Sequence, residues 1–189
     1  MRADAISGEF DENAKHPLII FMPEISRTHM GGTMRLGLRP TVFEQGSEQW
    51  SKVRKLYGGA EKIWERHRHR YEVNPDYIER LAASGMPFVG KDEKGERMQV
   101  LELPDHPYFV GLQAHPEFCT RPLNPSPPFL GFIAAAAGSK VLEEQLAIQL
   151  KSFSPPHPVH AMVSEAELRN AEPSQSEAPG KEVAMTTEQ

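Results

Sequence analysis

Residues 86–114, MPFVGKDEKGERMQVLELPDHPYFVGLQA, carry the pattern that decides the fold of this 189-residue chain. The stretch consists of three apolar runs and the turns between them, at 86–90, 98–103 and 108–114 with turns at 94–95 and 105–107. Short apolar runs separated by glycine- and proline-containing turns are typical of neighbouring β-strands. The middle third of the chain is therefore predicted to form a sheet.

Helical and extended patterns flank this stretch, which indicates an α/β or α+β fold. Extended segments are predicted at 17–22 and 33–43. A helix over 47–57 is predicted to begin at the cap Ser47 and to end at Gly58-Gly59. Two more helices are predicted, one from Asn74-Pro75 to Ser84-Gly85 and one over 129–137, whose pattern allows a continuation past Gly138 to Leu150.

The composition divides the chain into a folded part, residues 1–150, and a tail, residues 151–189. The tail is rich in proline and acidic residues and has a single aromatic residue, Phe153, so it is predicted to be disordered. The net charge of −5 argues against nucleic acid and anionic membranes as partners. No apolar run approaches the roughly 20 residues that span a bilayer, and no signal peptide is apparent, so a cytoplasmic location is expected.

The densest charge cluster is residues 65–72, ERHRHRYE. On a strand, alternate residues face opposite sides, so arginines and histidines would occupy different faces: Arg66, Arg68 and Arg70 on one, His67 and His69 on the other. Three guanidinium groups on one face could bind carboxylates or phosphates, and a solvated, salt-bridged strand is the alternative. The histidines could also chelate a metal, but no neighbouring residue completes a site, so no metal is predicted.

His115 and Glu117 directly follow the last run of the predicted sheet. Residues two apart in an extended chain project to the same side, so the carboxylate can orient the imidazole and leave its other nitrogen as a general base. This pair provides two members of a nucleophilic triad. Cys119 is not predicted to complete it, because a nucleophile two residues beyond the orienting acid would have to fold back on the same loop.

Four stretches together resemble the C-terminal glutamine amidotransferase domain of CTP synthases: SGEFD at 7–11, GGTMRLG at 31–37, ERHRHRYEVN at 65–74 and HPEF at 115–118. The match extends from about residue 4 to Gly138. The resemblance implies an α/β fold, an incomplete class I glutamine amidotransferase (flavodoxin-like) sheet with flanking helices.

The resemblance also implies a chemistry. In this family a cysteine thiolate attacks the side-chain amide of L-glutamine, with His115 as its base and Glu117 as the orienting carboxylate. Glu9 and Arg70 match positions that hold the charged α-groups of glutamine. The ammonia goes to a synthase domain, where ATP and Mg²⁺ convert UTP to CTP.

The sequence matches only the C-terminal part of such an enzyme, so the nucleophile and the synthase domain are expected to precede the matched region. No cofactor is therefore expected in this chain, and other CTP synthase subunits are expected partners, as in the homo-oligomers of the family. The alternative is a catalytically inactive, truncated paralogue that binds or regulates full-length CTP synthase.

Overall fold

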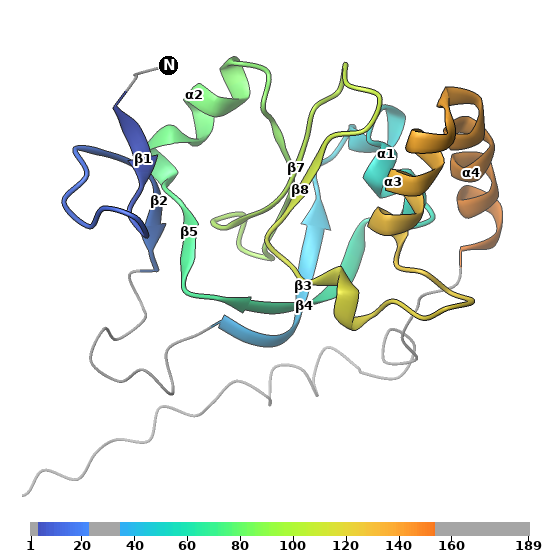
Figure 1. Cartoon of the computed structure of the whole chain (residues 1–189), viewed down its shortest axis with the longest axis horizontal. Coiled ribbons are helices and arrows are strands. Elements are labelled where there is room, and N and C mark those ends of the chain that lie inside the picture. Colours follow the sequence, from blue (N-terminus) through green and yellow to red (C-terminus); the bar gives the residue numbers. More distant parts are fainter. Residues whose placement is uncertain (1–3, 23–34, 154–189) are drawn as a thin grey trace, which may run out of the picture. The chain divides into compact units, whose positions relative to one another are not determined.

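The protein, seen here in a computed structural model, is described over residues 4–22 and 35–153 (Figure 1). Five strands form an antiparallel sheet in the order β4-β3-β6-β7-β8. Their bounds are β3 (Arg35–Phe43), β4 (Lys62–His69), β6 (Phe88–Lys91), β7 (Met98–Glu102) and β8 (Val110–Leu112). The three predicted runs of residues 86–114 are confirmed as β6, β7 and β8.

A smaller sheet has three strands in the order β1-β2-β5. The strands are β1 (Ala5–Ser7), β2 (His16–Phe21) and β5 (Tyr71–Val73). β1 runs parallel to β2, and β2 runs antiparallel to β5. β2 confirms the extended segment predicted at 17–22. β1 was not predicted, because three residues give too short a pattern to distinguish a strand from a loop.

A proline in the long strand β3 is compatible with the sheet because of where the strands pair. Pro40 lies opposite Trp64 of β4, whereas β6 pairs with β3 only at Val42 and Phe43. A proline has no N–H to donate, so it is tolerated where one side of a strand has no partner. The predicted extended segment 33–43 is thus confirmed from residue 35 onward, and residues 33–34 lie outside the described ranges.

The first helical region differs from its prediction at the N-terminal end. Residues Ser47–Gln49 form a 3₁₀ turn, η1, and the helix α1 spans Lys52–Leu56. The N-cap is Ser51, whose hydroxyl accepts a hydrogen bond from the Arg54 N–H. The prediction of Ser47 as the cap was wrong, because a second serine four residues later satisfies the helix amides. The predicted stop is confirmed: Gly58 and Gly59 have φ of 68° and 76°, a conformation that favours glycine.

The remaining helices follow the expected boundaries with one exception. Asn74 caps the 3₁₀ turn η2 (Pro75–Tyr77), which leads into α2 (Ile78–Ala83). The apolar helix α3 (Pro127–Ala137) does not continue through Gly138. That residue has φ of 129° and ψ of 157°, and a separate helix, α4 (Ser139–Ser152), begins after it. The predicted tail lies outside the described residues from residue 154 onward.

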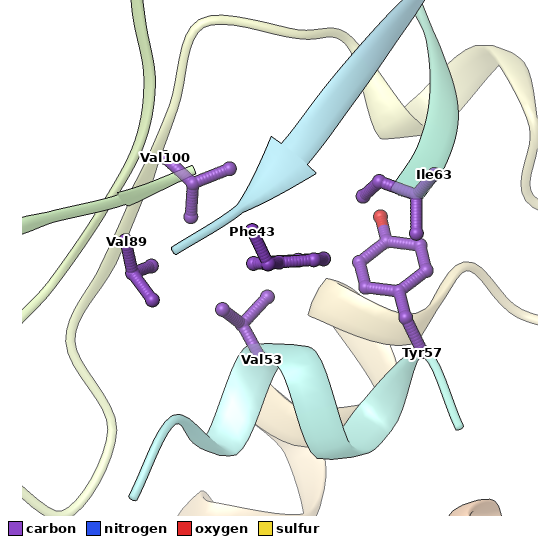
Figure 2. Packing of buried hydrophobic residues seen from close by; sticks show 6 residues of the cluster. All are labelled: Phe43, Val53, Tyr57, Ile63, Val89 and Val100. Carbon is purple, nitrogen blue, oxygen red and sulfur yellow. The ribbon is translucent and has the colours of Figure 1, made fainter. Parts of the chain in front are cut away.

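The core lies between α1 and the larger sheet. Figure 2 shows Val53 of α1 directed toward Phe43 at the end of β3, with Tyr57, the residue that follows α1, beside them. Ile63, Val89 and Val100 of the neighbouring strands complete this cluster of fully buried side chains. α1 also contacts α3 and α4 (Figure 1). The strand that carries Ile63 continues to the charge cluster of residues 65–72, so the core directly supports the candidate site.

Candidate active site

The turn after β8 positions His115 and Glu117. The His115 N–H donates to the carbonyl oxygen of Arg66 in β4 at 2.8 Å, which attaches the turn to the sheet. A 3₁₀ turn, η3 (Pro116–Phe118), follows at once and directs the chain back. It brings His115 Nδ1 to 2.7 Å from Glu117 Oε1. The predicted proximity of these two side chains is present in the structure.

This geometry has a definite chemical consequence. A carboxylate at Nδ1 holds the proton on that nitrogen, so Nε2 is left unprotonated and able to accept a proton. Burial acts to raise the pKa of Glu117, but a backbone hydrogen bond and the hydrogen bond and charge of His115 outweigh it and hold that pKa below its usual value. The side chains of His115 and Glu117 are 39% and 50% exposed. The pair is thus an oriented base that a reacting group can reach.

Two side chains next to the pair pack against each other. The Arg66 guanidinium lies over the Phe118 ring, 5.5 Å from its centroid, and the Phe118 ring lies 5.8 Å from the His115 ring. A guanidinium above an aromatic face is attracted by the ring quadrupole. Arg66, one of the three arginines predicted to share a face, therefore also packs against η3. The alternation of faces along β4 is as predicted, with Arg66 and Arg68 exposed.

Glu9 and Arg70, the other two predicted site residues, lie next to strands of the smaller sheet. Glu9 is exposed in the turn after β1, where its N–H donates to the Ser7 hydroxyl. Arg70 is half-buried between β4 and β5, and its carbonyl accepts from the Met22 N–H at 2.9 Å. Their neighbours Gly8 and Tyr71 line one cavity of about 110 Å³. The structure brings His115 and Glu117 together.

Cys119, the single cysteine of the sequence, lies at the end of η3 in an environment that suppresses its reactivity. It is 4% exposed. Burial, together with the neighbouring Glu65 carboxyl, raises the pKa of the Cys119 thiol to about 11. Because the thiolate is the nucleophilic form, this cysteine has the character of a structural residue, in agreement with the prediction.

On the other face of β4, His67 is buried and His69 is half-buried. His67 is completely buried and has no hydrogen-bond partner among the described residues. His69 Nδ1 donates to the Tyr71 carbonyl. Burial, and secondly nearby charges, lower the pKa of His67 to about 3, and burial lowers that of His69 to about 4. No cluster of three metal-ligating side chains occurs within residues 4–22 and 35–153.

The buried His67 predicts acid sensitivity. Above pH 6.5 the imidazole is neutral in both states; below it the unfolded chain takes up a proton that the folded chain binds only near pH 3. The contribution of neutral His67 to the free energy of unfolding is therefore present above pH 6.5 and is lost as the pH falls toward 3. Between pH 7 and pH 5, urea unfolding should show a loss of about 2 kcal/mol from this residue. His67→Leu should remove that part of the loss, whereas His106→Leu, at an exposed site, should not. If the free energy of unfolding fell equally between pH 7 and pH 5 in His67→Leu and in the unaltered chain, the acid sensitivity would not come from His67.

The α/β arrangement and the histidine–carboxylate pair after strand β8 point to one class of enzymes. The family model for class-I glutamine amidotransferases matches residues 8–135. The chain therefore belongs to the class-I glutamine amidotransferase family.

Within that family the chain is similar to CTP synthases. The chain is 65% identical over 135 residues to CTP synthase of Neurospora crassa, covering 71% of this chain and 23% of that protein. It is 55% identical over 134 residues to CTP synthase of Schizosaccharomyces pombe and 56% identical over 135 residues to CTP synthase 1 of Danio rerio, in each case covering 71% of this chain and 22% of the relative. It thus spans about a quarter of the length of the curated relatives it matches.

A solved structure supports the fold. The glutaminase domain of Trypanosoma brucei CTPS with bound acivicin superimposes with a TM-score of 0.64 and 34% identity, covering 71% of this chain and 51% of that one. The predicted glutamine amidotransferase fold is confirmed by this match. None of the helices in the described ranges has the length and apolar character to traverse a bilayer.

Proposed function

We propose that this chain forms part of a glutamine-hydrolysing CTP synthase and supplies the base half of its glutaminase site. The observation that carries the proposal is the 2.7 Å contact between His115 Nδ1 and Glu117 Oε1 in a chain that matches CTP synthases at 55–65% identity. The complete reaction would be the ATP-dependent amination of UTP to CTP with ammonia from L-glutamine.

His115 and Glu117 have distinct parts in the proposed reaction. Nε2 of His115 accepts the proton of a cysteine thiol, and the thiolate attacks the side-chain amide carbon of glutamine. The imidazolium, stabilised by Glu117, then gives the proton to the leaving ammonia, and water hydrolyses the remaining thioester. Because Cys119 is buried and its pKa is raised, we assign the nucleophile to a cysteine outside this sequence.

Substrate binding is the proposed part of Glu9 and Arg70. Arg70 offers a guanidinium to the α-carboxylate of glutamine, and Glu9 a carboxylate to its ammonium. Arg70 lies four positions after Arg66, whose carbonyl oxygen accepts a hydrogen bond from the His115 N–H. Four residues of an extended chain span about 13 Å. Both residues thus belong to the same short segment of chain, which would place the group that holds the α-carboxylate near the base. ATP and Mg²⁺ would act in a synthase domain outside the described residues, and other synthase subunits are the expected partners.

A chimera tests the proposal. The 135-residue segment of the Neurospora crassa synthase that aligns with this chain is replaced by the corresponding residues of this protein. CTP formation is then measured with glutamine and, separately, with ammonium chloride. We expect glutamine-supported activity within about tenfold of the parent enzyme, because the base, orienting acid and substrate-binding residues are all supplied. Retained ammonia-supported activity with no glutamine-supported activity would overturn the proposal.

The second candidate is a regulatory paralogue without chemistry of its own. The unreactive environment of Cys119 is compatible with this candidate as it is with the first. The chimera does not test this candidate, since a paralogue that is inactive only because it lacks a nucleophile would support glutamine hydrolysis once a nucleophile is provided. Binding of the 189-residue chain to an intact synthase would then be its expected property.

A further inference from the structure

Arg97 connects the larger sheet to the smaller one through two acidic side chains. It lies just before β7, and its Nε is 3.2 Å from Oε2 of Glu72 in β5. Its Nη1 donates to Oδ2 of Asp92, also at 3.2 Å. The side chains of Arg97, Glu72 and Asp92 are 18%, 10% and 6% exposed. An ion pair so far withdrawn from water is costly to break from one side, because the remaining charge keeps its burial and loses its partner.

Asp92 holds Arg97 from the turn between β6 and β7. Its Oδ1 accepts from the N–H groups of Glu96 and Arg97 at 2.8 and 3.1 Å. The Asp92 N–H in turn donates to the Arg97 carbonyl at 3.0 Å. The turn also contains Gly95, with φ of 73°, a conformation that favours glycine. The Arg97 guanidinium is therefore anchored to the larger sheet independently of Glu72.

The strand β5, by contrast, has little support of its own. It consists of three residues, and among the described residues the one strand that pairs with it is β2. The Met22 N–H donates to the Arg70 carbonyl before β5, and the Asn74 N–H donates to the Leu18 carbonyl after it, each at 2.9 Å. Glu72 is the middle residue of β5, so its ion pair fastens this short strand to the larger sheet.

We propose that Arg97 is a positioning residue for glutamine binding: its ion pair with Glu72 fixes β5 and thereby Arg70, the residue that directly precedes this strand. The inference rests on the proposed function, in which Arg70 binds the α-carboxylate of glutamine. Arg97 does not touch the substrate and acts through Glu72. His115 and Glu117 lie on a different turn, so the reacting end of the site does not depend on this ion pair.

The first test measures hydrogen exchange in the 189-residue chain, which needs no activity. Arg97→Met keeps a long unbranched side chain and removes the charge. The Met22 and Asn74 amides, which flank β5, should exchange at least about fivefold faster in this variant, because the strand opens locally. The His115 amide, which donates to a carbonyl of β4, should change less than about twofold. Equal acceleration of all three amides, or no acceleration of any, would overturn the inference.

The second test uses the chimera and the dependence of its rate on glutamine concentration. Arg97→Met should raise KM for glutamine about tenfold and leave kcat within about twofold, because a displaced Arg70 weakens binding rather than chemistry. Ammonia-supported CTP formation should not change. Arg97→Lys retains a charge that can reach one carboxylate and should recover part of the affinity. An unchanged KM, with or without a lower kcat, would show that Arg97 does not position the substrate.

Lys91→Met is the matched control. Lys91 belongs to β6, and its Nζ lies 2.6 Å from Oε1 of Glu44 in an ion pair that does not involve β5. This variant also removes one cation and one ion pair, so KM and the exchange of the two amides should stay as in the unaltered protein. If it reproduced the effects of Arg97→Met, the lost charge would be the cause and the inference would be wrong. A chimera without glutamine-supported activity would defeat the proposed function, whereas the exchange measurement would still decide whether Arg97 holds β5.

Discussion

In the chimeric synthase, His115→Ala is expected to lower glutamine-supported CTP formation about 10³-fold, since general base catalysis typically contributes 10²–10⁴-fold. Ammonia-supported CTP formation should change less than about twofold, because the loss is confined to glutamine hydrolysis. Glu117→Gln should cause a smaller loss, as the imidazole remains but loses its orienting charge. The measurement is the ratio of the two rates for each variant.

The control for this prediction is His106→Ala. His106 is exposed in the loop between β7 and β8, so both rates should remain close to those of the unaltered chimera. An equal decrease of both rates in His115→Ala would point to damage in the whole enzyme. Glutamine-supported activity that survives this substitution would remove His115 from the mechanism.

Replacing Glu102 by alanine is expected to destabilise the fold by about 3 kcal/mol. Glu102 ends β7, is 1% exposed and caps α1 from across the core. Its carboxyl accepts from the Ser51 hydroxyl at 2.7 Å and from the Lys52 and Val53 amides at 2.8 and 3.4 Å. Alanine would leave these buried donors without an acceptor. The free energy of unfolding in urea, measured at pH 7, gives the size of the effect.

Glu79→Ala is the comparison for this experiment, because Glu79 is an exposed acid on α2. It should change the free energy of unfolding by less than about 0.5 kcal/mol. A similar small change in Glu102→Ala would mean that the Ser51 cap holds α1 without the carboxyl group. Glu102→Gln retains one acceptor oxygen and should fall between the two.

The sequence predicted elements whose signals are local. The runs that became β6, β7 and β8 have turns on both sides, and Gly58-Gly59 ends α1 where expected. The N-cap was misplaced because Ser47 and Ser51 both have a suitable side chain. What decides between them is Glu102, about 50 residues away in the sequence, which binds the hydroxyl of Ser51. Such a tertiary contact leaves no mark in the local pattern.

In the candidate site, too, local features could be predicted from the sequence and features that depend on tertiary contacts could not. The spacing of His115 and Glu117 is short enough for their contact to be predicted from the sequence. The burial of Glu65 and His67 was not predicted, because it depends on which face of β4 packs against the core. The sequence did contain a signal for this burial. In residues 65–70 every second residue is an arginine, and if the arginines are exposed, Glu65 and His67 must face inward.

The alternation along β4 has a consequence for which changes in length the protein can tolerate. A deletion of one residue between Lys62 and His69 would turn every later side chain to the opposite face. Guanidinium groups would then enter the core, and the carbonyl that holds His115 would point elsewhere. An insertion beside Gly138, where α3 has already ended, would cause no such exchange. Variation in length among natural versions of this protein should therefore be found between α3 and α4 and not within β4.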